Sequence, residues 1–271
     1  MLGLIFKLID KFLVPYVGKK EKYYAFRRLY ELSIRGMNIG GGSDVHDSGE
    51  FAVLQLLKQK FESKEKVVVF DVGANVGNYA KGILDIFGSS KVDLHSFEPS
   101  PKTFVKLEET LEPYRGSNIH LHNFGLSNTA CEIELFQDAE LSGMTSVYKR
   151  RMDHFGKDFN IAEMASFSAL DEFCVDNGIE AIDFLKLDVE GHELKVLEGA
   201  SNMLPKVKYI QFEFGGCNID SRTFFQDFYY LLNSQFDIYL ILKDGIQKLD
   251  GYKETYELFI TTNFLCINKS L

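Results

Sequence analysis

The sequence of 271 residues has no tryptophan, only five prolines and only four cysteines. The cysteines are scattered, and no two of them form a Cys-x-x-Cys pair. This spacing excludes a cysteine-based zinc or redox motif. Isolated thiols with apolar neighbours are typical of core residues in a reducing compartment. We therefore expect free, buried thiols at Cys131, Cys174, Cys217 and Cys266.

The chain also lacks a long uninterrupted apolar run at its start. The segment MLGLIFKLIDKFLVPYVGKK is broken by Lys7, Asp10 and Lys11, which excludes a membrane-spanning helix there. It also lacks the cleavage site and continuous apolar centre of a signal peptide. Its apolar residues recur at helical spacing, which predicts an amphipathic helix. We expect residues 1–35 to pack on the domain, on a second subunit or on the inner face of a membrane, in a cytoplasmic protein.

Positive charge is scarce as well. Lys and Arg number 30 against 39 Asp and Glu, which gives a net charge of −9. Nucleic-acid binding usually leaves a basic footprint, so a nucleic-acid partner is not expected. His120 and His122 form a His-x-His pair, but no third ligand lies near them in the sequence. We therefore do not predict a metal site there.

From residue 45 to 271 the sequence alternates strand and helix patterns. Apolar strand patterns at 67–72, 92–98, 182–191 and 207–214 are separated by helix patterns. Alternation of this kind predicts a three-layer α/β fold with a mostly parallel sheet. The last two strands, 236–242 and 257–267, have no helix between them and are expected to pair as a hairpin. Residues 1–44 are predicted to form a helical arm and a glycine-rich connection.

Two further predictions concern the middle of the chain. The segments 119–127 and 131–137 resemble a strand pair around a turn at Ser127-Asn128. Residues 138–166 are polar and irregular, with the basic run Lys149–Arg151, and they are expected to cover the substrate site. A solvated loop is the alternative for this insertion.

The turn after the first strand limits which ligand the sheet can bind. It reads FDVGANVGNYA at 70–80, with Asn75 where a dinucleotide-binding turn has its middle glycine. The Asn75 side chain would fill the space that a pyrophosphate needs, and no P-loop lysine follows. Glu98 ends the next strand, where an acid can accept hydrogen bonds from both hydroxyls of a ribose. Together these features favour S-adenosylmethionine over a nicotinamide dinucleotide.

A cluster of ionisable side chains follows a third strand. The segment DFLKLDVEGHELKVLEGA at 183–200 brings together Asp188, Glu190, His192 and Glu193. Ending an apolar strand in so many charges is costly unless they face a cleft. Acids in a cleft are common catalytic groups.

These segments, with NFGLSN at 123–128 and IQFEF at 210–214, resemble the FkbM-type family of S-adenosylmethionine-dependent O-methyltransferases. The resemblance covers roughly residues 45–267. It implies a Rossmann-like methyltransferase fold and methylation of hydroxyls, typically on sugars of glycans or on polyketides. It also implies that Glu98 binds the ribose, that the first turn holds the methionine part, and that residues 125–127 border the adenine. The cofactor-binding residues predicted in this way are Asp71, Gly73, Asn75, Gly77, Asn78, Glu98, Pro99, Gly125, Leu126, Ser127 and Asp188.

The resemblance leaves the catalytic roles to be assigned from chemistry. An alcohol is poorly ionised at neutral pH and needs a base or a metal. Asp188 is the first candidate for the base, with Glu190 beside it and His192 ranked behind them. Glu213 could complete a carboxylate pocket, and dependence on a divalent metal is left open. The segment SGE at 48–50 also resembles a family element, which implies that Glu50 lies at the edge of the active site. The acceptor side is further predicted to include Met144 and Glu193.

Two other functions remain as alternatives. A nicotinamide-dependent sugar oxidoreductase or epimerase would share the sheet, but it should carry a three-glycine turn and a later Tyr-x-x-x-Lys pair. A non-catalytic binding protein on the same fold is disfavoured because acids remain at four strand ends: Asp71, Glu98, Asp188 and Glu213. The acceptor, the methylated position and the oligomeric state are not determined by the sequence.

Overall fold

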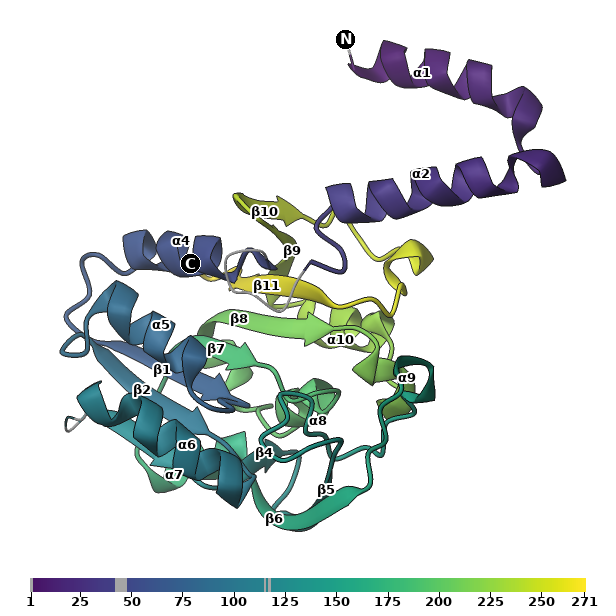
Figure 1. Ribbon diagram of the computed structural model, residues 1–271. Coiled ribbons are helices and arrows are strands. Elements are labelled where there is room, and N and C mark those ends of the chain that lie inside the picture. The colour runs from purple at the N-terminus through teal and green to yellow at the C-terminus, as the bar shows by residue number, and fades with distance from the viewer. Residues whose placement is uncertain (1, 42–47, 115, 117) are drawn as a thin grey trace. The chain divides into compact units, whose positions relative to one another are not determined.

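The computed structural model describes residues 2–41, 48–114, 116 and 118–271 (Figure 1). The chain divides into two compact units, Met1–Gly40 and Gly41–Leu271. Most of the predicted glycine-rich connection, residues 42–47, lies outside the described residues.

The first unit is helical, as the sequence predicts. Helix α1 spans Leu2–Leu13 and α2 spans Tyr23–Gly36, with short 3-10 turns at Val14–Tyr16 and Lys20–Lys22 between them. The side chains of Ile9 and Phe12 are exposed in this unit. Among the described helices of the whole chain, none has the length and apolar character needed to cross a bilayer. The predicted contact of residues 1–35 with the domain, a second subunit or a membrane stays a prediction.

The second unit is built on an eight-stranded sheet of order β10-β9-β11-β8-β7-β1-β2-β3. The five strands from β8 to β3 in this order are parallel to one another. Their bounds are β1 Val67–Val72, β2 Val92–Phe97, β3 Ile119–His122, β7 Ile182–Leu187 and β8 Val207–Phe214. The carboxyl ends of β1, β2 and β7 therefore lie side by side at one edge (Figure 1).

Helices cover both faces of this sheet, which confirms the predicted three layers. In β1, Val67 and Val69 belong to one apolar core, and Phe70 and Val72 belong to the other. This alternation has the period of two that a strand buried on both faces requires. The first core includes α4 Glu50–Lys60, α5 Asn78–Phe87 and α6 Pro101–Leu111, and the second includes α7 Leu170–Asp176, α8 Glu193–Glu198 and α10 Phe225–Leu232.

The end of the sheet is more elaborate than predicted. Strands β9 Phe236–Leu242 and β11 Thr262–Asn268 do pair antiparallel, but β11 also pairs with β8 and so lies between β8 and β9. The hairpin is instead formed by β9 with β10 Gly245–Lys248. Strand β10 was not predicted, because it is only four residues long and half exposed and so has no clear apolar pattern.

A second, three-stranded sheet has the order β4-β6-β5. Its strands are β4 Gly125–Ser127, β5 Cys131–Gln137 and β6 Ile161–Ala169. The predicted pairing of 119–127 with 131–137 is therefore wrong, because β6 lies between β4 and β5 and β3 joins the large sheet. The prediction that 138–166 is irregular is wrong at its end, where β6 begins. Alanine and serine dominate β6, and these residues give a weak strand signal.

Candidate active site

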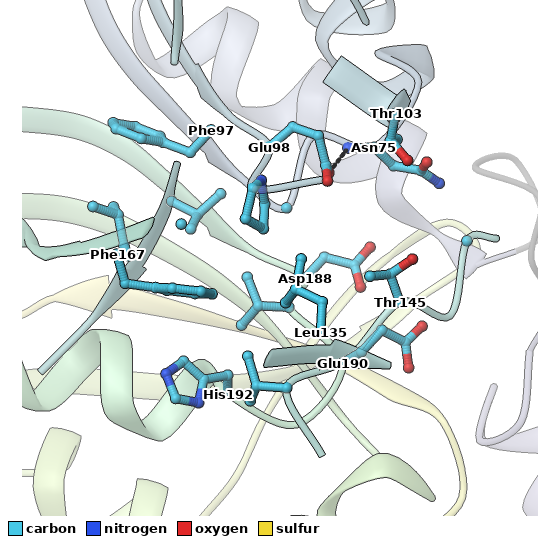
Figure 2. A pocket seen from close by; sticks show the side chains of 18 of the residues that line it. Asn75, Phe97, Glu98, Thr103, Leu135, Thr145, Phe167, Asp188, Glu190 and His192 are labelled. Atoms are coloured by element: carbon cyan, nitrogen blue, oxygen red, sulfur yellow. Dashed lines mark hydrogen bonds between the residues drawn. The ribbon is translucent and has the colours of Figure 1, made fainter. Parts of the chain in front are cut away.

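A pocket opens at the carboxyl ends of β1, β2 and β7, and the small sheet and the 138–166 insertion form its other walls (Figure 2). This is the edge at which open α/β sheets bind ligands. The lining residues fall into five groups. They are 72, 73 and 75 at the end of β1; 97–99 and 103 at and after the end of β2; 125, 126, 135 and 167 of the small sheet; 142, 143, 145 and 147 of the insertion; and 188–190 and 192 after β7.

The turn after β1 forms one wall of the pocket. Gly73 has φ +83°, and a Cβ there would lie 1.9 Å from the carbonyl oxygen of Asp188, so only glycine fits. Asn75 also has a left-handed backbone, with φ 49°. Its N–H donates to Oε2 of Glu98 at 3.0 Å, and its own buried Oδ1 has no hydrogen-bond partner among the described residues. An acceptor without a partner is thus held at the pocket wall.

Glu98 follows β2 and is held on both sides by backbone groups. Its Oε1 accepts the N–H of Ser100 at 2.9 Å, and its Oε2 accepts that of Asn75. The residue is buried, and this burial raises the pKa of its carboxyl to about 7. A buried carboxylate fixed in this way has further lone pairs to offer a ligand.

The opposite part of the pocket is apolar. Leu126, Leu135, Val147 and the ring of Phe167 line it, and Figure 2 shows Phe167 across the pocket from Glu98. A Cβ on Gly125 would lie 2.2 Å from the Phe167 ring, so this glycine lets the ring approach the backbone. The pocket therefore has a polar wall near Glu98 and an apolar wall on the small sheet.

Beneath the pocket, a buried lysine links the first and third strand ends. The Nζ of Lys186 lies 3.1 Å from Oδ2 of Asp188 and 3.6 Å from Oδ1 of Asp71. It also lies over the ring of Tyr79, 4.5 Å from its centroid. Lys186 is 4% exposed, whereas the Asp188 side chain is 40% exposed and faces the pocket. The ammonium thus stabilises a carboxylate that a ligand can reach.

The other acid of this pair, Asp71, does not line the pocket. It is fully buried, and neither of its oxygens has a hydrogen-bond partner among the described residues. Burial raises the pKa of its carboxyl, and the nearby Lys186 opposes that shift. The structure therefore places Asp71 next to Lys186 and outside the pocket lining.

A chain of hydrogen bonds extends this buried layer to α4. The hydroxyl of Tyr79 donates to Oε1 of Gln211 at 3.1 Å, and Nε2 of Gln211 donates to Oε1 of Glu50 at 2.8 Å. Burial raises the pKa of Glu50, and the charge of Lys186 opposes this. Glu50 does not line the pocket itself.

Glu190 joins the third strand end to the insertion. Its carboxylate accepts a hydrogen bond from Nη1 of Arg150 at 2.6 Å, and its φ of 51° is unusual for a residue other than glycine. Burial and the charge of Asp188 raise the pKa of Glu190 to about 8, although Arg150 opposes them. Glu213, at the end of β8, has its pKa raised well above the ordinary value by burial and by the charges of Asp188 and Glu190. At this edge, the negative charge of one carboxyl group thus raises the pKa of another.

His192 lies at the apolar side of the pocket. Its Nε2 is 2.9 Å from Oγ of Ser127, and its Nδ1 is 3.3 Å from the hydroxyl of Tyr148. Burial lowers the pKa of His192 to about 4. The imidazole is therefore neutral at physiological pH and is a weak base.

Glu193 does not face the pocket but holds the loop that carries the acids. It is fully buried, and its Oε1 accepts the N–H groups of Val189 and Gly191 at 3.0 and 3.2 Å. Burial raises the pKa of its carboxyl to about 7. Glu193, for which the sequence predicted an acceptor contact, thus lies outside the pocket lining, and its contacts support the loop.

We expect Glu193→Ala to lower the free energy of unfolding by about 1–3 kcal/mol, because one buried and one part-buried N–H group lose their acceptor. It should also lower turnover, since the loop from Asp188 to Glu190 loses its support. Glu193→Gln keeps an acceptor oxygen and should restore most of both losses. Urea unfolding curves of the two variants at one pH give the comparison. Equal stability of Glu193→Ala and the wild type would contradict this role.

The pocket brings together most of the predicted site residues but not all of them. Seven of the predicted cofactor-binding residues line it. The three candidates for the base that follow β7, Asp188, Glu190 and His192, also line it. The predicted residues outside the lining include Gly77, which precedes α5, the exposed Asn78, Ser127 and Met144. Gly143 and Thr145, on either side of Met144, belong to the lining. Lys186 and Phe167 were not predicted from the sequence. Arg150 was predicted only as part of the basic run Lys149–Arg151.

This architecture is that of a Rossmann-like methyltransferase: a sheet with the pocket at its carboxyl edge, an acid at the second strand end and a carboxylate cluster at the third. The FkbM methyltransferase domain matches residues 71–238, which is more than half of the chain. The chain belongs to the FkbM methyltransferase domain family.

Two curated relatives of this chain are also named methyltransferases. The hexuronic acid methyltransferase AglP of Haloferax volcanii is 32% identical over 60% of this chain and 61% of its own length. The 2-O-methyltransferase NoeI of Sinorhizobium fredii is 26% identical over 56% of this chain and 64% of its own length. The chain thus spans less than two thirds of the length of these relatives. A solved FkbM methyltransferase from Methylobacillus flagellatus KT is 17% identical, with a TM-score of 0.47 over 74% of this chain and 44% of that one.

Proposed function

We propose that this protein transfers a methyl group from S-adenosylmethionine to a hydroxyl of a sugar or glycan. The observation that carries the proposal is the placement of Glu98, Asn75 and Asp188 around one pocket that has an apolar opposite wall. Family membership and the names of the two curated relatives support the reaction and the kind of acceptor.

The pocket has side chains that suit each part of S-adenosylmethionine. Glu98 can accept hydrogen bonds from two ribose hydroxyls while its backbone contacts hold it in place. The unpartnered Oδ1 of Asn75 can accept a hydrogen bond from an ammonium group of the methionine part. The apolar wall with Phe167 suits a purine ring. The bound cofactor would supply an electrophilic methyl group on a sulfonium.

The chain itself must position the acceptor and remove its proton. In-line displacement depends mainly on the alignment of the two reactants. We propose Asp188 as the base because its carboxylate reaches the pocket and Lys186 holds it in one place. Glu190 is the second candidate, because a carboxyl with a pKa of about 8 is mostly protonated at neutral pH. His192 is ranked third, because burial lowers its pKa to about 4 and its two ring nitrogens lie near the hydroxyls of Ser127 and Tyr148.

The proposed location is the cytoplasm, and peripheral contact of residues 1–35 with a membrane stays a prediction. All four cysteines are free, and three of them are buried, which suits a reducing compartment.

The proposal is tested with methyl-labelled S-adenosylmethionine and a panel of glycosides. We expect label on a sugar hydroxyl, and mass spectrometry of the product fixes the position. Hexuronic acid and neutral hexose glycosides should be compared side by side, because one curated relative carries the hexuronic acid name. Transfer to a carboxylate, giving an ester that mild base removes, would contradict O-methylation of a hydroxyl.

A further inference from the structure

Three side chains of types that can bind a metal lie together on the α7 face of the large sheet. Asp93 and His95 belong to β2, and His120 belongs to β3. These parallel strands place His95 directly opposite His120. Asp93 lies two positions before His95, so it points to the same face. The ligand atoms of the three residues all lie within 4.8 Å of one another.

Contacts to Lys66 and His122, and one contact within the group, already orient these donors. Nε2 of His120 lies 3.2 Å from Oδ1 of Asp93, and Lys66 lies 2.9 Å from Oδ2 of Asp93. Nδ1 of His95 lies 3.1 Å from Nε2 of His122, which leaves Nε2 of His95 for another partner. The rings of His95 and His120 are stacked with centroids 4.5 Å apart. Metal ligands are commonly fixed by such contacts to their second polar atom.

The group is accessible and separate from the candidate active site. It lines a cavity together with Asn177, Gly178 and Glu180, which follow α7. None of the residues lining this cavity lines the candidate active site. The His120 side chain is 40% exposed, so an ion can approach from solvent.

We propose that Asp93, His95 and His120 form a binding site for a divalent ion of the zinc class. Two imidazole nitrogens and one carboxylate oxygen are a usual set of three protein ligands for zinc, with water at the fourth position. The bound ion would tie β3, the edge strand of the large sheet, to β2. The sequence showed only the His120–His122 pair, because Asp93 lies on another strand, 27 positions before His120.

The test is a calorimetric titration of the full chain, without a histidine tag and freed of metal by chelation, with zinc chloride. We expect one ion per chain and a higher melting temperature when zinc is present. His120→Ala and Asp93→Asn should each weaken zinc binding about tenfold or more and remove the rise in melting temperature. The matched control is His154→Ala, which removes an exposed histidine outside the cluster and should bind zinc like the wild type.

Cobalt(II) gives a second readout, because absorption bands typical of a four-coordinate site should appear in the wild type and be lost in His120→Ala. The proposal is overturned if the wild type does not bind zinc in molar excess, or if the three variants bind it equally well. Asp93→Asn nearly preserves the side-chain shape, so it decides the matter if His120→Ala does not fold. Binding of S-adenosylhomocysteine should be the same with and without zinc, which separates this proposal from the proposed function.

Discussion

Asp188→Asn is expected to lower the turnover number about 10²–10⁴-fold, the range that a positioned general base contributes. The amide keeps the shape of the side chain but cannot accept the proton of an alcohol. Affinity for S-adenosylhomocysteine should change only a few fold, because Glu98 and the apolar wall remain. Methyl-transfer rates at saturating cofactor, together with calorimetric titrations, separate the two effects.

The matched control for this variant is Asp237→Asn. Asp237 also pairs with a lysine, Lys248, at 2.7 Å, but on the surface of β9 and away from the pocket. It should keep the turnover of the wild type. Full activity of Asp188→Asn would remove Asp188 from the mechanism. A wild-type turnover number that rises with an apparent pKa near 8 would assign the base to Glu190 instead.

Glu98→Gln is expected to weaken binding of S-adenosylhomocysteine about 10–100-fold, since hydrogen bonds to a charged group are worth about 1.5–3 kcal/mol. The amide offers one acceptor where the carboxylate offers two. Calorimetric titration of the wild type and the variant measures the change. Glu109→Gln, at an exposed residue of α6 that pairs with Lys106, is the control and should bind like the wild type.

The same residue gives the binding a pH dependence. With a pKa of about 7, Glu98 is mostly protonated at pH 6 and mostly ionised at pH 8. Ribose hydroxyls donate to the ionised form, so affinity should rise with pH up to about 7 and then level off. The rise below pH 7 is at most about tenfold per pH unit. Glu98→Gln should lack this rise, and a wild-type affinity that falls over this range would contradict the assignment.

The sequence predicted the parts of the site that depend on strand ends. In a parallel sheet, residues that follow neighbouring strands meet at one edge. Alternation of strands and helices therefore sufficed to bring Glu98 and Asp188 together. The turn at Gly73 was equally predictable, because its glycine and Asn75 have a local backbone signature.

The parts that were missed depend on contacts between distant segments. In the sequence, Lys186 is a single charged residue within an apolar strand. Its contacts with Asp71 on β1 and Asp188 after β7 become visible only in the structure. Arg150 comes from an insertion whose path the sequence does not define. Strands β4 and β5 were predicted, but their arrangement around β6 was missed because the residue pattern of β6 is weak, although that strand carries Phe167 into the pocket.

The central claim is that this pocket binds a methyl donor rather than a dinucleotide. The most direct test is a calorimetric titration of the wild-type protein with S-adenosylhomocysteine and, in parallel, with NAD. We predict one S-adenosylhomocysteine per chain and no heat of binding with NAD, because Asn75 stands where a dinucleotide-binding turn has its middle glycine. Binding of NAD without binding of S-adenosylhomocysteine would contradict the account.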